Sequence, residues 1–128
     1  QQNLQTRINT HPGDLFDTDF PKAMDAVLLS HMLTIWSEEN NVRLLKKAFQ
    51  ALPVGGKLFV FNMAVEDDQR GPFSSALGSL YFQCIATGEG RLYTQKEFIK
   101  MIEKAGFKLE KTEKLPQAHY LWTAVKRA

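Results

Sequence analysis

The chain has 128 residues, of which 44% are hydrophobic and 23% charged, so it is long enough for one domain with a modest core. Its formal net charge of +2, with lysines and arginines scattered along the chain, argues against a nucleic-acid-binding face. No apolar run approaches the length of a membrane span and no signal peptide is recognised, so we expect a cytoplasmic protein with no membrane partner. Cys84 is the only cysteine, which excludes an internal disulfide and the usual cysteine zinc sites.

The first part of the chain predicts a short strand, a loop and a buried strand. Residues 7–10 fit a short edge strand, and residues 11–22 (HPGDLFDTDFPK) carry the proline, glycine and aspartate that are typical of a loop. Asp25 marks the start of a strand, and residues 25–29 (DAVLL) continue as an uninterrupted apolar run. Such a run suits a strand buried on both faces, as in a parallel sheet.

A helix and a second buried strand are expected next. Ser37 is a good helix N-cap, and Glu38 and Glu39 in the first turn suit the positive end of the helix dipole. Residues 57–63 (KLFVFNM) predict a buried strand, and residues 64–72 (AVEDDQRGP) a polar loop. The apolar residues that recur on one side of the helix are Val42, Leu45, Phe49 and Leu52.

An apolar stripe then predicts a second amphipathic helix over residues 73–85. Cys84 falls in this helix and is expected to be a buried small hydrophobe. The residues of the stripe are Phe73, Leu77, Leu80, Tyr81 and Ile85.

The end of the chain predicts a third helix and a pair of strands. Thr94 and Glu97 have the spacing of a capping box, and Gly106 ends the helix that they begin. Residues 107–115 (FKLEKTEKL) and 119–127 (HYLWTAVKR) alternate in polarity, which suits an antiparallel pair near a sheet edge. The residues of the third helix that are expected to face inward are Phe98, Ile102 and Ala105.

Two stretches of the chain carry a recognisable pattern. The first runs from GDLF at residues 13–16, through DAVLL, to WSEENNVRLLKKAFQALPVGGKLFVFNM at residues 36–63, and the second is GEGRLYTQKEFIKMIEKAGF at residues 88–107. In that order they resemble the C-terminal domain of S-adenosylmethionine-dependent O-methyltransferases, of the small-molecule kind that includes plant caffeate-type and bacterial antibiotic-tailoring enzymes. The resemblance covers about residues 8–125. It implies an α/β fold with a truncated, Rossmann-like methyltransferase sheet that lacks its first strands and ends in an antiparallel strand pair.

The resemblance also implies that residues 1–128 form a single partial methyltransferase domain. The family's glycine-rich cofactor loop, and the acidic residue after its second strand, would precede residue 8, and neither is present. The family's N-terminal dimerisation domain is absent as well. We therefore expect the chain to be the latter part of a catalytic domain, with an incomplete site that leaves it inactive on its own.

The implied cofactor is S-adenosylmethionine, and the implied substrate is a small molecule. Asp14 and Leu15 fall where the family contacts the adenine of the cofactor, and Ser30 falls where the family touches its methionine part. Trp36 matches the family's tryptophan after the catalytic histidine. The candidate residues of the substrate pocket are Trp36, Met63 and Phe82.

The expected general base is missing from its position. Thr34 stands where the family has its basic histidine, and Ile35 stands where an aspartate follows. A threonine hydroxyl has far too high a pKa to act as a base near neutral pH. His31, three residues earlier, is a possible substitute base, although a lone histidine in an apolar segment is more often a hydrogen-bonded core residue.

The other candidates also have a structural interpretation. Asp14 can cap its own turn, and Trp36 can simply pack the strand–helix junction. The stripe over residues 73–85 can be part of the core or can line a substrate channel. The three acidic residues of the polar loop suit a solvated loop better than a cation site, so no metal is expected; they are Glu66, Asp67 and Asp68.

Two functions remain open at this point. The first is an enzyme that transfers a methyl group from S-adenosylmethionine to a small molecule, with oxygen as the favoured acceptor. The second is a non-catalytic, methyltransferase-like binding or assembly domain that has lost its base. Without the family's preceding strands, residues 25–29 have a bare edge that invites pairing with another copy, so a homodimer or a swapped assembly is expected.

Overall fold

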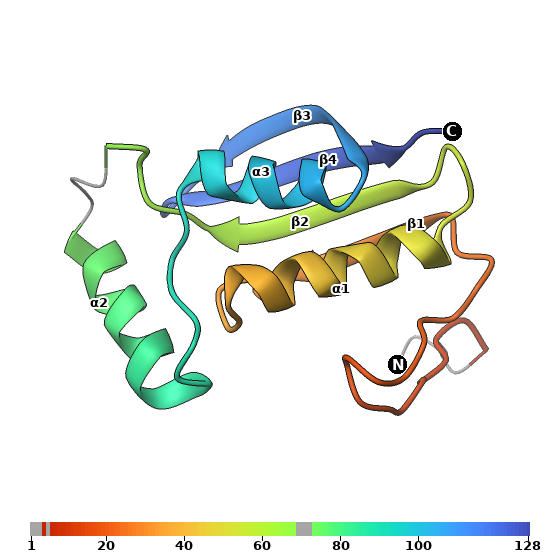
Figure 1. Cartoon of the computed structure of the whole chain (residues 1–128), viewed down its shortest axis with the longest axis horizontal. Helices are drawn as coiled ribbons and strands as arrows, with labels where there is room; N and C mark the ends of the chain where they lie inside the picture. Colours follow the sequence, from red (N-terminus) through yellow and green to blue (C-terminus); the bar gives the residue numbers. More distant parts are fainter. Residues whose placement is uncertain (1–3, 5, 69–72) are drawn as a thin grey trace.

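A mixed four-stranded sheet carries helices on one of its faces (Figure 1). The computed structural model describes residues 4, 6–68 and 73–128. β1 and β2 are parallel, β4 is antiparallel to β2, and β3 is antiparallel to β4, which confirms the expected strand pair at the end of the chain. In spatial order the strands are β1 (Ala26–Ser30), β2 (Lys57–Met63), β4 (His119–Lys126) and β3 (Phe107–Leu115).

The core lies between the sheet and two helices, α1 (Glu38–Ala51) and α3 (Gln95–Lys104). Alternate residues of β2 and β4 point toward these helices and are fully buried, as the period of two in a strand requires. The apolar faces of both helices pack onto them, as the helical spacing predicts. The largest apolar side chains buried there are Trp122, Phe98, Leu33, Leu44, Leu45, Leu58, Met101 and Ile102.

The helix ends follow the capping pattern expected from the sequence. Ser37 caps α1 by accepting a hydrogen bond from the Asn40 N–H at 3.3 Å. At the start of α3, Thr94 accepts from the Glu97 N–H at 3.2 Å, and the Glu97 carboxylate accepts from the Thr94 N–H at 2.7 Å. This is a complete capping box. In the part of the chain that the structure describes, no helix is long and apolar enough to cross a bilayer.

Two expectations about the first part of the chain are wrong. Residues 7–10 are not a strand, because the chain turns there and the N–H groups of Arg7 and Ile8 both donate to the Leu4 carbonyl. β1 is not buried on both faces, because helices cover only one face of the sheet and Leu28 on the other face is 62% exposed. β1 pairs only with β2, so it does form an edge of the described sheet, as expected.

The predicted helix over residues 73–85 differs in shape and burial. It consists of α2 (Phe73–Tyr81) followed by a π-helical turn, η1 (Phe82–Ala86). Figure 1 shows α2 at one end of the sheet, so neither sheet face packs onto its apolar side. Its stripe residues Leu77, Leu80 and Tyr81 are therefore exposed, and Cys84 is exposed rather than buried. The side chains of Phe73 and Ile85, and residues 69–72 of the preceding polar loop, lie outside those that the structure describes.

Candidate functional site

The parallel strands β1 and β2 end at the same edge of the sheet, which is where α/β proteins usually bind ligands. The junction loop, residues 31–37, follows β1 and leads into α1. A second segment, which we name the strap (residues 87–93), runs from η1 to the start of α3 beside this loop (Figure 1). The junction loop contains three of the candidate residues, His31, Thr34 and Trp36.

The position of the missing base holds a buried, neutral hydrogen-bonded pair. Thr34 is only 1% exposed, and its Oγ1 donates to Oδ1 of Asn62, a fully buried residue of β2, at 3.3 Å. Neither side chain titrates near neutral pH. The Nδ2 group of Asn62 is buried and has no hydrogen-bond partner among the described residues. At this position Thr34 and Asn62 can therefore form hydrogen bonds, but neither can act as a general base.

His31 lies on the opposite face of the sheet from Thr34. Its backbone N–H donates to the Phe61 carbonyl at 2.8 Å, and its φ of 51° is in the left-handed region. Its ring packs edge-on against Phe61 and His119, at centroid distances of 4.9 and 5.1 Å. Partial desolvation, followed by the nearby charge of His119, lowers the pKa of His31. Because Phe61 and Asn62 are neighbours in β2, their side chains point to opposite faces, and His31 and Thr34 do likewise.

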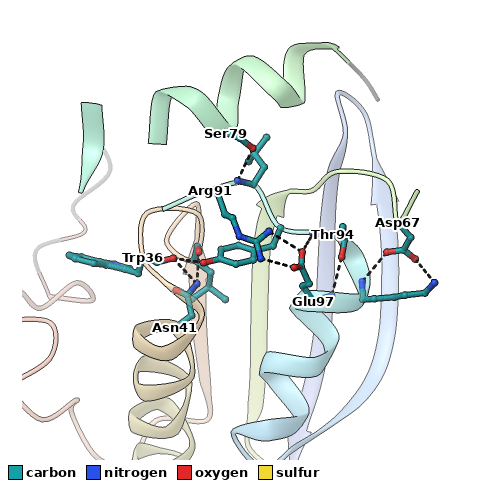
Figure 2. Close-up of polar contacts among 11 residues, drawn as sticks. Trp36, Asn41, Asp67, Ser79, Arg91, Thr94 and Glu97 are labelled. Atoms are coloured by element: carbon teal, nitrogen blue, oxygen red, sulfur yellow. Dashed lines mark hydrogen bonds and ion pairs between the residues drawn. The ribbon is translucent and has the colours of Figure 1, made fainter. Parts of the chain in front are cut away.

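Trp36 is held by a contact to its ring and by two hydrogen bonds to its carbonyl oxygen. Its ring packs edge-on against Phe16 at 5.0 Å, and its carbonyl accepts from the Tyr93 hydroxyl at 2.7 Å and from Asn41 Nδ2 at 3.2 Å (Figure 2). Asn41 Nδ2 also donates to the Leu33 carbonyl at 2.6 Å. The geometry thus supports the packing interpretation of Trp36, while its buried indole N–H has no partner within the described ranges.

Asp14 caps its own turn. Its Oδ1 accepts from the N–H groups of Phe16 at 2.8 Å and Asp17 at 3.0 Å, and these two bonds lower the pKa of the carboxyl group. Lys47 of α1 fixes the turn by donating to the carbonyls of Leu15 and Thr18, both at 2.7 Å. The turn borders a hollow of about 100 Å³. Since Phe16 contacts Trp36, the turn adjoins the junction loop. Both bonds of the Asp14 carboxylate to the turn use the same oxygen, Oδ1.

The remaining candidates lie at the same edge but are not joined by contacts to Thr34. Ser30 is the exposed last residue of β1, and Met63 is the half-buried last residue of β2. Phe82 begins η1 and packs edge-on against Tyr81 at 5.4 Å. A separate groove of about 880 Å³ on α1 contains none of the candidate residues.

The acidic loop after β2 has structural partners. Glu66 pairs with Lys114 at 2.9 Å. Asp67 accepts from the Lys96 N–H at 3.1 Å, at the start of α3, and pairs with the Lys96 side chain at 3.6 Å. Within the described ranges, no three histidine, cysteine, aspartate or glutamate side chains gather as a metal site requires.

Sequence reasoning missed three residues of this edge. Asn62 and Asn41 are fully buried polar side chains on otherwise apolar faces of β2 and α1, and that contrast was the available signal. Tyr93 is also buried, and its hydroxyl reaches the junction loop across 57 positions of sequence. Nothing in the local pattern around Tyr93 predicts that contact.

Known methyltransferases are similar to this chain in sequence. The model of the O-methyltransferase domain family matches residues 1–108. The L-tyrosine C(3)-methyltransferase of Streptomyces lavendulae is 36% identical over 115 residues, which are 90% of this chain and 31% of that protein.

Two solved structures are similar in fold. An O-methyltransferase family 2 protein from Planctomyces limnophilus, in complex with apigenin, has a TM-score of 0.82 and 33% identity, over 91% of this chain and 34% of its own. Human N-acetylserotonin methyltransferase in complex with SAM has a TM-score of 0.82 and 25% identity, over 92% of this chain and 33% of its own. The predicted Rossmann-like methyltransferase fold is confirmed, and the chain spans about a third of the length of these relatives.

Proposed function

Because the chain belongs to the O-methyltransferase domain family, we propose that it is part of an enzyme that transfers a methyl group from S-adenosylmethionine to a small molecule. We favour oxygen as the acceptor atom, as in most proteins of the family. The observation that carries the proposal is the family match over residues 1–108, together with a junction loop at the carboxyl edge of parallel strands. On this view residues 1–128 are the latter part of one catalytic domain.

The residues at this edge suit the cofactor. Ser30 is exposed where β1 ends, and the Asp14 turn is fixed beside the junction loop through Phe16 and Trp36. Asp14 uses Oδ1 to hold its turn, so in our proposal Oδ2 faces the adenine, with Leu15 next to it. When bound, the cofactor supplies an electrophilic methyl group.

The chemistry that we expect of this chain is alignment rather than proton abstraction at Thr34. Holding the acceptor and the methyl group in line can supply much of the rate enhancement of a displacement reaction. The Thr34–Asn62 pair takes no proton, so an acceptor bound there must already be acidic, or must pass its proton to another group. His31 can be that group only for an acceptor that lies on the open face of the sheet, because its side chain packs against Phe61 and points away from Thr34.

The pH dependence of methyl transfer tests this assignment. We would measure kcat/KM of a protein that contains the complete catalytic domain, with a series of substituted phenols whose own pKa values differ. If the acceptor ionises by itself, the midpoint of the pH profile follows each phenol, and His31→Gln leaves it unchanged. If the midpoint is the same for all phenols and disappears in His31→Gln, then His31 is the base.

A second candidate function is a non-catalytic binding or assembly domain. The neutral Thr34–Asn62 pair favours it, because a domain without catalysis is under no selection to keep a base at this position. Cofactor binding without methyl transfer to any acceptor would support this alternative.

We also propose that two copies associate through β1. This strand pairs only with β2 in the described sheet, so the N–H and C=O groups of its outer edge can pair with another chain. Sedimentation should show a dimer, and Leu28→Pro, which removes a backbone donor from the outer edge of β1, should shift the chain toward a monomer. A monodisperse wild-type monomer would contradict the proposal.

A further inference from the structure

The strap contacts the backbone of the junction loop from Ile35 to Ser37. Thr87 Oγ1 donates to the Ile35 carbonyl, and the Tyr93 hydroxyl donates to the Trp36 carbonyl at 2.7 Å. The Ser37 N–H donates to Glu89 Oε2 at 3.2 Å. Asn40 of α1 donates to the same Glu89 oxygen at 2.9 Å. Three successive residues of the junction loop are therefore each bonded to the strap.

Gly90 brings the strap against the preceding residue as well. It is buried, and a Cβ atom there would overlap the Thr34 carbonyl oxygen and lie 2.6 Å from the Ile35 carbonyl oxygen. Because both obstacles are backbone atoms, no rotation of a side chain could relieve the overlap. Only glycine allows the strap to lie this close to the junction loop.

The strap is also hydrogen-bonded to α2 and to Val65, which follows β2. The Leu92 N–H donates to Ser79 Oγ of α2 at 3.2 Å (Figure 2). The Val65 N–H donates to the Tyr93 carbonyl at 3.0 Å. The strap thus connects the junction loop to a helix whose apolar residues Leu77 and Leu80 are exposed.

Arg91 stiffens the centre of this connection. Its guanidinium group lies over the Tyr93 ring, 4.2 Å from the centroid. It also bonds both Glu97 oxygens, at 2.6 and 3.3 Å, and Glu97 completes the capping box of α3. Tyr93 is therefore held in place from α3 while its hydroxyl bonds the junction loop.

We propose that the strap is a positioning element, which fixes the junction loop relative to α2 and so sets the place of the methyl acceptor. What it positions rests on the proposed function, whereas the contacts that it makes do not. In this account Tyr93, Glu89 and Gly90 are positioning residues that act through the backbone of residues 34–37. Ser79 does not contact the junction loop, and in this account it acts on the loop through its bond to the strap.

Amide hydrogen exchange in the full chain tests the proposal without any cofactor. Tyr93→Phe removes one hydroxyl, and we expect the Ile35 and Ser37 amides to exchange about five- to tenfold faster, with no change in β2 or β4. Tyr120→Phe is the matched control, since the Tyr120 hydroxyl bonds Gln95 and Glu66 and not the junction loop. Glu89→Ala should also speed exchange at Ser37, and Glu89→Gln, which keeps an acceptor oxygen, should restore it.

Ser79→Ala separates positioning from simple local packing. Among the described residues the Ser79 side chain bonds only to the strap, so faster exchange at Ile35 and Ser37, by about two- to threefold, would show that α2 acts on the loop through it. Unchanged exchange at these amides in both Tyr93→Phe and Ser79→Ala would overturn the proposal, and so would an equal increase across the whole sheet. Failure of the proposed function would instead appear as absent binding of S-adenosylhomocysteine with these exchange effects intact.

Discussion

The two faces of the sheet are made by the same strands and differ in what covers them. On the helix-covered face, Leu58, Val60 and Trp122 are fully buried. On the open face, Phe59 and Phe61 are only half-buried although they alternate with those residues in β2. Alternation in a strand thus determines which way a side chain points, but burial also needs a second layer.

The largest difference in stability should be between two substitutions in β4, one on each face of the sheet. Trp122→Ala removes the largest buried side chain and should lower the free energy of unfolding by about 3–5 kcal/mol. Leu121→Ala changes the adjacent, half-buried residue on the open face and should cost about 1 kcal/mol. Urea unfolding measures both values, and comparable losses would mean that the open face is also covered in solution.

A pair of threonines gives an intermediate effect. Thr34→Val keeps the shape of the side chain but leaves Asn62 Oδ1 without its donor, at a cost of about 1–2 kcal/mol. Thr123→Val, on the open face of β4, is the matched control and should be nearly neutral because its hydroxyl can reach water. Thermal unfolding of the two variants should separate them clearly. A neutral Thr34→Val would show that the buried pair does not stabilise the loop.

The smallest effects concern pH. The pKa of His31 on the open face is lowered by desolvation and by His119, so the unfolded state binds its proton more readily, and stability falls as the pH drops below about 6.5. For Glu97, burial alone would raise the pKa, but its bonds from Arg91 and Thr94 outweigh this and lower it. Its contribution is therefore present above about pH 4.5 and is lost as the pH falls through the lowered value.

Two variants should remove these contributions separately. His31→Gln should reduce the change below pH 6.5, and Glu97→Gln should reduce the change below pH 4.5, in urea unfolding repeated across pH, with Asp14 keeping part of the acidic change in Glu97→Gln. Arg91→Lys keeps the charge but not the two-pronged bond, so it should weaken the Glu97 effect only in part. Identical pH profiles for wild type and both glutamine variants would contradict the assignment.

The sequence predicted the parts of the fold that local patterns determine. The caps at Ser37 and Thr94 and the antiparallel pair at the end of the chain depend on neighbouring residues and on alternation, so they could be predicted. The exposure of Leu28 and Cys84 depends on whether another layer covers them, which no local pattern contains. Residues 7–10 are predicted to be a strand but form a turn, because so short a segment carries too little pattern to distinguish the two.

The candidate site was predictable in position and less so in its contacts. The resemblance placed it at the junction loop after β1. The partner of Thr34, however, is Asn62, and the bonds of Trp36 and Ser37 come from Tyr93 and Glu89, more than 50 positions away. Such contacts arise only when the strands and the strap come together.

Calorimetric titration of the chain with S-adenosylhomocysteine tests the central claim most directly. We predict saturable binding that weakens in Asp14→Asn, which can keep the Oδ1 bonds of the turn but replaces Oδ2 with a donor that repels the adenine amino group. Asp17→Asn, in the same turn, is the control and should bind as the wild type does. Absence of binding, or binding that Asp14→Asn leaves unchanged, would contradict the cofactor site proposed here.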